Sequence, residues 1–163
     1  MTTIDQPTAT EIPKALHVGE GDLPFVAVGD GTHIQLLKVD LDRGLWVVRT
    51  RFEPGTTIQT HRHTGEVHAF TVAGSWKYLE YPEVNTAGSY LYEPAGSVHT
   101  LTVPASNDGL TDVFFTIEGA NLNLDADGNV VAVLDAGAIL DGYLALCEAY
   151  GLGRPQVLGA PQP

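Results

Sequence analysis

The chain of 163 residues has few basic side chains: Lys and Arg total 8 against 20 Asp and Glu, which gives a formal net charge of −12. A protein that binds nucleic acid needs clustered cations to neutralise phosphates, and an anionic membrane surface attracts cations for the same reason. The composition therefore predicts that neither nucleic acid nor a membrane surface is a partner.

Cysteine and long apolar runs are also scarce. The single cysteine, Cys147, excludes an intrachain disulfide and a cysteine-rich zinc site, and its apolar surroundings predict a buried, inert thiol. No apolar run approaches the roughly 18 residues of a membrane span. The first residues lack the basic start and apolar stretch of a secretory signal. Together these absences predict a protein of the reducing cytoplasm.

What the chain does contain is a series of short β-rich segments broken by Gly, Pro, Asn and Asp. Their near-regular spacing and the lack of βα alternation predict an all-β, antiparallel barrel or sandwich. We expect the barrel to span about residues 31–134, with a tight turn at 125–129. The expected strands are 33–40, 45–53, 56–63, 67–74, 75–81, 89–93, 98–103, 111–119 and 130–134.

The C-terminal part has a different pattern. Between residues 136 and 150 apolar side chains recur at helical spacing, and Gly151 and Pro155 follow as stop signals. This predicts one C-terminal helix packed on the barrel or on a neighbouring subunit. Residues 1–15 are mostly polar and are expected to form a flexible arm, with residues 1–163 making one domain.

His61 and His63 stand two apart in an expected strand, so their side chains should point to the same face. Two imidazoles there would repel each other if protonated, whereas a metal ion binds both rings in the neutral form. A pair of surface histidines near a strand end would show the same spacing. The histidine pair alone therefore does not distinguish a metal site from two surface histidines, and the surrounding residues are needed for that.

Two glycine-containing motifs surround these histidines. They consist of Gly55, His61, His63 and Gly74, followed by Gly88, Pro94, Gly96 and His99. His99, at the end of the second motif, could reach the pair from the opposite side of a small barrel. At this order and spacing the chain resembles the cupin superfamily. The resemblance implies a single-domain cupin barrel, or jelly roll, that holds one metal ion through three histidines.

The chain departs from the cupin pattern where the family carries a glutamate ligand, because that position holds Val67. Glu66 and His68 flank it and should face the other way by strand alternation. If the motif is counted with one more residue, His68 takes the place of the glutamate and a four-histidine site results; a bulge would bring in Glu66. Alternation favours the three-histidine site. The asparagine that closes the second motif is also replaced, by Val103.

The segments 60–82 and 87–101 resemble more narrowly the cupins grouped with 2,4'-dihydroxyacetophenone dioxygenase, and more distantly the acetylacetone-cleaving dioxygenase. This likeness implies Fe(II) on His61, His63 and His99, and oxidative cleavage of the C–C bond beside a carbonyl. The expected partners are a small ketone, dioxygen and further copies of the chain in a homodimer or homotetramer. Zn or Ni would fit the same ligands. A metal-binding sensor without catalysis and a zinc-dependent hydrolase or isomerase are the competing hypotheses.

Other side chains near the expected site have weaker support. Glu93 directly precedes the turn that leads to His99, where it would orient a ligand histidine or handle a substrate proton, or else face solvent. Arg49 and Arg51 would contact an anionic substrate or form salt bridges outside the barrel. For the substrate pocket we expect Phe115, Arg51, Thr102 and Val67.

Overall fold

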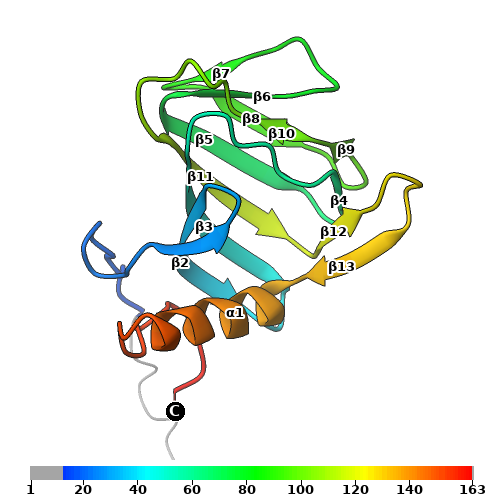
Figure 1. The fold of residues 1–163 in the computed structure, drawn as a ribbon. Coiled ribbons are helices and arrows are strands. Elements are labelled where there is room, and N and C mark those ends of the chain that lie inside the picture. Colours follow the sequence, from blue (N-terminus) through cyan, green and yellow to red (C-terminus); the bar gives the residue numbers. More distant parts are fainter. Residues whose placement is uncertain (1–12, 163) are drawn as a thin grey trace, which may run out of the picture.

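The structure, a computed structural model, describes residues 13–162, so the arm expected at 1–15 lies largely outside it. The described part is built of short strands followed by one helix, α1 (Ala136–Ala149) (Figure 1). The strands are β1 (Val26–Gly29), β2 (Thr32–Asp40), β3 (Leu45–Phe52), β4 (His61–His63), β5 (Val67–Ala73), β6 (Ser75–Tyr78), β7 (Asn85–Thr86), β8 (Tyr90–Glu93), β9 (Val98–His99), β10 (Leu101–Thr102), β11 (Thr111–Glu118), β12 (Asn121–Leu124) and β13 (Val130–Leu134).

The strands form three antiparallel sheets. The largest has the order β1-β2-β3-β11-β5-β8, and the smaller ones have the orders β13-β12-β4-β9 and β10-β6-β7. Apolar side chains from the sheets pack into one core, which also takes in the buried face of α1. The expected all-β class with a single C-terminal helix is thereby confirmed for the described residues (Figure 1).

Strand alternation explains how the core is filled. On β3 the buried Trp46, Val48 and Phe52 alternate with half-buried Val47, Arg49 and Arg51, as a sheet with one face on the core requires. Helix α1 begins at an N-cap, where the side chain of Asp135 accepts a hydrogen bond of 2.8 Å from the backbone N–H of Ala138. Its buried Tyr143 donates a hydrogen bond of 2.6 Å to the carbonyl of Pro24, which fixes the helix on the barrel beside β1 and β2.

Three expected strands are wrong in extent. The strand expected at 75–81 ends at Tyr78, as β6. In the segment 56–63 only His61–His63 form a strand, because the pairing before it is limited to one isolated antiparallel bridge between Thr57 and Thr102. The segment 98–103 divides into β9 and β10, which join different sheets. The division falls at Thr100, whose backbone N–H and hydroxyl both donate to the carboxylate of Glu80 at 2.8 Å.

Three short strands, β1, β7 and β12, were not expected from the sequence. The turn expected at 125–129 is present between β12 and β13, where the Asp125 side chain accepts hydrogen bonds from the backbone of Asp127 and Asn129. Cys147 is buried on α1, as predicted for an inert thiol. In the described part of the chain, no helix is long and apolar enough to cross a membrane.

Candidate metal centre

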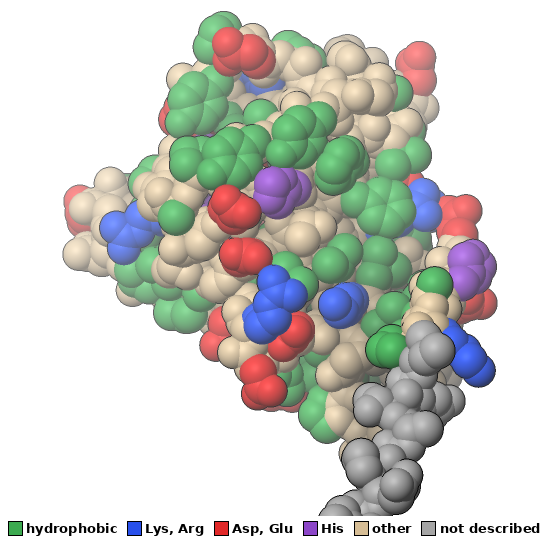
Figure 2. Space-filling view, turned by 180° about the vertical axis from the view of Figure 1, so that it is seen from behind, with side chains coloured by type: hydrophobic (Ala, Val, Ile, Leu, Met, Phe, Trp, Pro, Cys, Tyr) green, Lys and Arg blue, Asp and Glu red, His purple; other side chains and the backbone are tan. Residues whose placement is uncertain are grey.

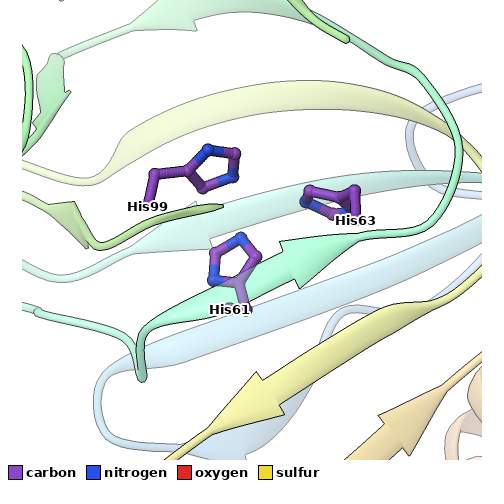
Figure 3. Close-up of side chains that lie close together, drawn as sticks. All are labelled: His61, His63 and His99. Carbon is purple, nitrogen blue, oxygen red and sulfur yellow. The ribbon is translucent and has the colours of Figure 1, made fainter. Parts of the chain in front are cut away.

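Three buried histidines meet inside the barrel. His61 and His63 come from β4, and His99 comes from the neighbouring β9, where it lies directly opposite His61 in the ladder. Their exposed fractions are 4%, 4% and 1%. Each offers one nitrogen, and the three nitrogens lie within 4.8 Å of one another. Figure 3 shows the rings converging from the two strands on a common centre.

The local sequence positions these rings in a simple way. On β4 the alternation buries His61 and His63 and leaves Arg62 between them exposed. The turn before β9 is held to the same strand, because the backbone N–H of Gly96 donates to the carbonyl of His63 at 2.7 Å. Gly96 has a φ of +87°, a conformation that glycine adopts without strain. The second motif thus anchors His99 beside the first.

The protein holds two of these imidazoles in the neutral form that a metal requires. Burial lowers the pKa of His63 to about 4, although the nearby carboxylate of Glu93 opposes the shift. Burial also lowers the pKa of His61, against a hydrogen bond with the carbonyl of Gln59. In this hydrogen bond Nδ1 of His61 lies 3.0 Å from the carbonyl oxygen of Gln59. The other ring nitrogen, Nε2, is left to face the point where the three histidines meet.

Glu93 points into the site rather than into solvent. It is 3% exposed, and its Oε2 lies 3.1 Å from Nε2 of His99 and 3.3 Å from Nε2 of His63. Neither contact is aligned as a hydrogen bond, so Oε2 has no hydrogen-bond partner among the described residues. Burial alone would raise the pKa of Glu93, but His99, Tyr78 and His63 together outweigh it and the net shift is downward. The carboxylate is therefore a negative charge beside the three nitrogens.

Tyr78 supports both His99 and Glu93. Its ring stacks on His99 with centroids 3.9 Å apart and an angle of 16° between the planes, and its hydroxyl donates to Oε1 of Glu93. Burial and the adjacent carboxylate raise the pKa of Tyr78 well above its usual value, so it remains a hydrogen-bond donor. Tyr78 is not among the site residues expected from the sequence.

These residues fit a divalent metal ion. The Nε2 atom of His99 and Oε2 of Glu93 are buried without hydrogen-bond partners in the part of the chain that the structure describes, which is costly unless another group satisfies them. A cation bound by neutral imidazole nitrogens would satisfy both. The donor set of three histidines suits iron, zinc and nickel alike.

The alternatives for a fourth ligand from the first motif are not supported. His68 faces the outside of the barrel, where its Nδ1 lies 2.7 Å from the Tyr90 hydroxyl. Glu66 lies beside it, with Oε1 3.3 Å from Nε2 of His68. Val67 between them is fully buried. Alternation therefore holds at this point of β5, as predicted, and no bulge turns Glu66 inward.

A cavity of about 330 Å³ opens beside the histidines in the barrel interior. Of the expected pocket residues only Phe115 lines it; Arg51, Thr102 and Val67 do not, and their assignment to the pocket is corrected. Apolar side chains make up most of its wall. The lining includes His61, His63, Tyr78, Phe115, Trp46, Val48, Phe52, Ile58, Leu101, Ile117, Leu134, Ile139, Asn121 and Asn123.

Ion pairing explains why Arg51 does not line the cavity, and a hydrogen bond explains the same for Thr102. Arg49 and Arg51 both donate to the carboxylate of Asp112, at 2.7–2.8 Å and 3.0 Å, and both approach Glu20. They form a salt-bridge cluster on the outer face of β3 and β11, away from the cavity. The hydroxyl of Thr102 instead lies 2.9 Å from that of Thr57.

Sequence reasoning missed two polar residues that line the cavity. Asn121 and Asn123 lie on β12, directly opposite His63 and His61 in the ladder with β4. The only signal is the alternation in the segment NLNL, which repeats the spacing of the histidine pair. It was not recognised because the strand itself was not expected.

Comparisons with known proteins agree with this architecture. Residues 13–119 match the family described as the ChrR cupin-like domain. A search of curated proteins finds no match. Among solved structures, a protein of unknown function with a cupin-like fold from Ralstonia eutropha JMP134 is 38% identical, with a TM-score of 0.83; the match covers 95% of this chain and 98% of that one.

Two further structures are similar at lower identity. Acetylacetone dioxygenase from Acinetobacter johnsonii is 18% identical with a TM-score of 0.71, covering 90% of this chain and 99% of that one. The anti-sigma ChrR in complex with SigE from Rhodobacter sphaeroides is 13% identical with a TM-score of 0.51, covering 61% and 50%. At these identities the likeness concerns the fold alone.

Proposed function

Starting from the fact that the chain belongs to the ChrR cupin-like domain family, we propose that it is a non-haem Fe(II)-dependent dioxygenase. Its reaction would be cleavage of the C–C bond next to a carbonyl in a small hydroxy-ketone or diketone. The observation that carries this proposal is the group of three buried histidines beside an apolar cavity of about 330 Å³. The proposal includes the narrower likeness to 2,4'-dihydroxyacetophenone dioxygenase. It also includes the choice of Fe(II), rather than Zn or Ni, as the bound metal.

The ligand set explains the choice of substrate class. Three neutral imidazoles and the one carboxylate of Glu93 beside them leave a divalent ion with a net positive charge, so anionic oxygen ligands from a chelating ketone are favoured. Bound Fe(II) would supply the redox chemistry by which dioxygen reacts with the chelated substrate. A hydroxy-ketone plus dioxygen would give two carboxylic acids, with both oxygen atoms retained in the products.

The side chains of the site would do the remaining work. His61, His63 and His99 hold the metal, and the apolar wall that includes Phe115 encloses a small aryl or alkyl group and excludes water. The carboxylate of Glu93, beside the nitrogens of His63 and His99, is the base available to take the proton that a chelating hydroxyl or enol loses. Tyr78 keeps that carboxylate in place through its hydroxyl.

The test is oxygen uptake by protein reconstituted anaerobically with Fe(II) and offered 2,4'-dihydroxyacetophenone, then acetylacetone. Uptake that depends on the ketone and is lost in His99→Ala is the expected result. Stoichiometric iron with neither uptake nor a spectral change on adding either ketone would contradict the proposal.

The family match favours one alternative, a metal-binding sensor domain without catalysis. The description of the family names ChrR, which is an anti-sigma factor. A sensor would bind metal and a partner protein, and its cavity would need no chelating ligand. Calorimetric titration of the Zn(II)-loaded protein with acetylacetone separates the two, because only the proposed enzyme requires the ketone to bind.

We also propose a homodimer or homotetramer in the cytoplasm. Figure 2 shows hydrophobic side chains gathered around a histidine on the rear face of the barrel. This aromatic face contains Phe70, Tyr90 and Tyr92, each about half exposed, on β5 and the edge strand β8. In a chain of net charge −12 a second copy meets least repulsion on such a face. Light scattering of the wild type and of Phe70→Lys tests the assignment, since the lysine should give monomers.

A further inference from the structure

Strand β12 places one asparagine opposite each histidine of β4. In this antiparallel ladder Asn121 pairs with His63 and Asn123 pairs with His61. Residues directly opposite in such a ladder point to the same face, with Cβ atoms about 4.5–5.5 Å apart. Each asparagine side chain therefore lies within reach of the imidazole opposite it.

One of these two pairs holds a matching donor and acceptor without partners. Nδ1 of His63 and Oδ1 of Asn121 are both buried, and neither makes a hydrogen bond within residues 13–162. A ring nitrogen that carries a proton needs an acceptor, and an amide oxygen needs a donor. Leaving either buried atom unpaired is energetically unfavourable, because the atom has lost its water without gaining a partner.

The other pair differs in the one respect that matters. Nδ1 of His61 already lies 3.0 Å from the carbonyl oxygen of Gln59, so this ring has its acceptor. Asn123 lines the same cavity but faces a histidine that needs nothing from it. The two asparagines thus share residue type, strand and face, but not the chemical situation of the histidine opposite.

Metal-bound histidines almost always donate their second ring N–H to an acceptor, which fixes the tautomer and the orientation of the ring. We propose that Asn121 is the positioning residue for His63: its amide oxygen accepts the Nδ1–H and thereby presents Nε2 to the metal. This role rests on the metal site of the proposed function. The amide is uncharged, so it orients the ring without reducing the positive charge that attracts an anionic substrate.

The experiment compares Zn(II) affinity, measured by competition with a chromophoric chelator, in the wild type, Asn121→Leu, Asn121→Asp and Asn123→Leu. Asn121→Leu should bind Zn(II) about 10–100-fold more weakly. Asn121→Asp retains an acceptor oxygen and should restore the affinity to near that of the wild type. Asn123→Leu, the matched control, should leave it unchanged. Thermal unfolding of the metal-free proteins separates a loss of affinity from a loss of fold.

A second measurement does not depend on any variant folding. In the Zn(II)-loaded wild type labelled with ¹⁵N-histidine and ¹³C-asparagine, NMR should show a protonated, slowly exchanging Nδ1 on His63, coupled across a hydrogen bond to a side-chain amide carbon. A rapidly exchanging Nδ1–H, or an equal loss of affinity in both leucine variants, would overturn the role of Asn121 and leave the metal site standing. A wild type that takes up no metal would instead overturn the proposed function, and this inference with it.

Discussion

Glu93 lies directly opposite Val67 in the ladder between β8 and β5, so its carboxylate is on the same face of the sheet as the buried Val67 side chain. Its Oε2 reaches to 3.1 Å from His99 and 3.3 Å from His63. The negative charge beside the three histidines therefore comes from β8.

This relationship predicts the effect of neutralising the carboxylate. Glu93→Gln keeps the shape but removes the charge beside the cation, and should weaken Zn(II) or Fe(II) binding about 10–100-fold. Chelator competition measures the change, with Glu83→Gln, at an exposed position, as the control.

The double exchange Val67→Glu with Glu93→Val moves the carboxylate from β8 to β5 at constant total volume. It should recover much of the affinity lost in Glu93→Gln. Unaltered binding in Glu93→Gln would mean that the carboxylate has no part in holding metal.

Metal binding should also stabilise the fold. At a free metal concentration about 1,000 times the Kd, the free energy of unfolding should rise by about 4 kcal/mol. His99→Ala removes one of the three nitrogens and should abolish the rise in Tm on adding metal. His33→Ala is the matched control, because that histidine lies outside the site, 3.1 Å from the exposed Glu53. If His99→Ala responds to metal as the wild type does, the ion binds elsewhere.

The metal-free protein should lose stability as the pH falls below neutrality. His63 has a pKa of about 4 in the folded state and about 6.5 when unfolded, so between these values the unfolded chain binds more protons than the folded one. As the pH falls from about 6.5 to about 4, the protonation of His63 in the unfolded chain should lower the free energy of unfolding by about 3 kcal/mol. Above about pH 6.5 this residue should have no effect on stability. His61 shifts in the same direction.

Urea unfolding of the metal-free protein between pH 7 and pH 4.5 measures this dependence. His63→Gln removes the titrating ring and should flatten the curve over the same range. Identical pH dependence in the two proteins would contradict the assignment to His63.

The salt-bridge cluster on the outer face should matter for stability and not for metal binding. The side chains of Arg49 and Asp112 are 12% and 8% exposed, so Asp112→Ala leaves a nearly buried guanidinium with only the exposed Glu20, at 3.4 Å, as its partner. We expect a loss of about 3 kcal/mol in unfolding free energy. The exposed pair of Arg43 and Glu118, at 3.7 Å, provides the control: Arg43→Ala should cost less than about 0.5 kcal/mol. A change in Zn(II) affinity in Asp112→Ala would show that this cluster is coupled to the site.

Much of the architecture follows from local patterns in the sequence. Period-two alternation placed His61 and His63 on one face, and it turned His68 and Glu66 to the other, as the structure confirms. The helical spacing of apolar residues predicted α1. Each of these features depends on neighbours within one or two turns or strands.

Tertiary structure alone decided the rest, because it depends on which distant strands pair and in which register. The break between β9 and β10 exists because Glu80, from another segment, holds Thr100. Arg51 does not line the cavity, because it donates a hydrogen bond to Asp112 opposite it on β11. Asn121 lies at the site because the register of β12 with β4 places it opposite His63. Residue type and spacing thus determined the chemistry of the three histidines, whereas long-range pairing determined the groups that support them.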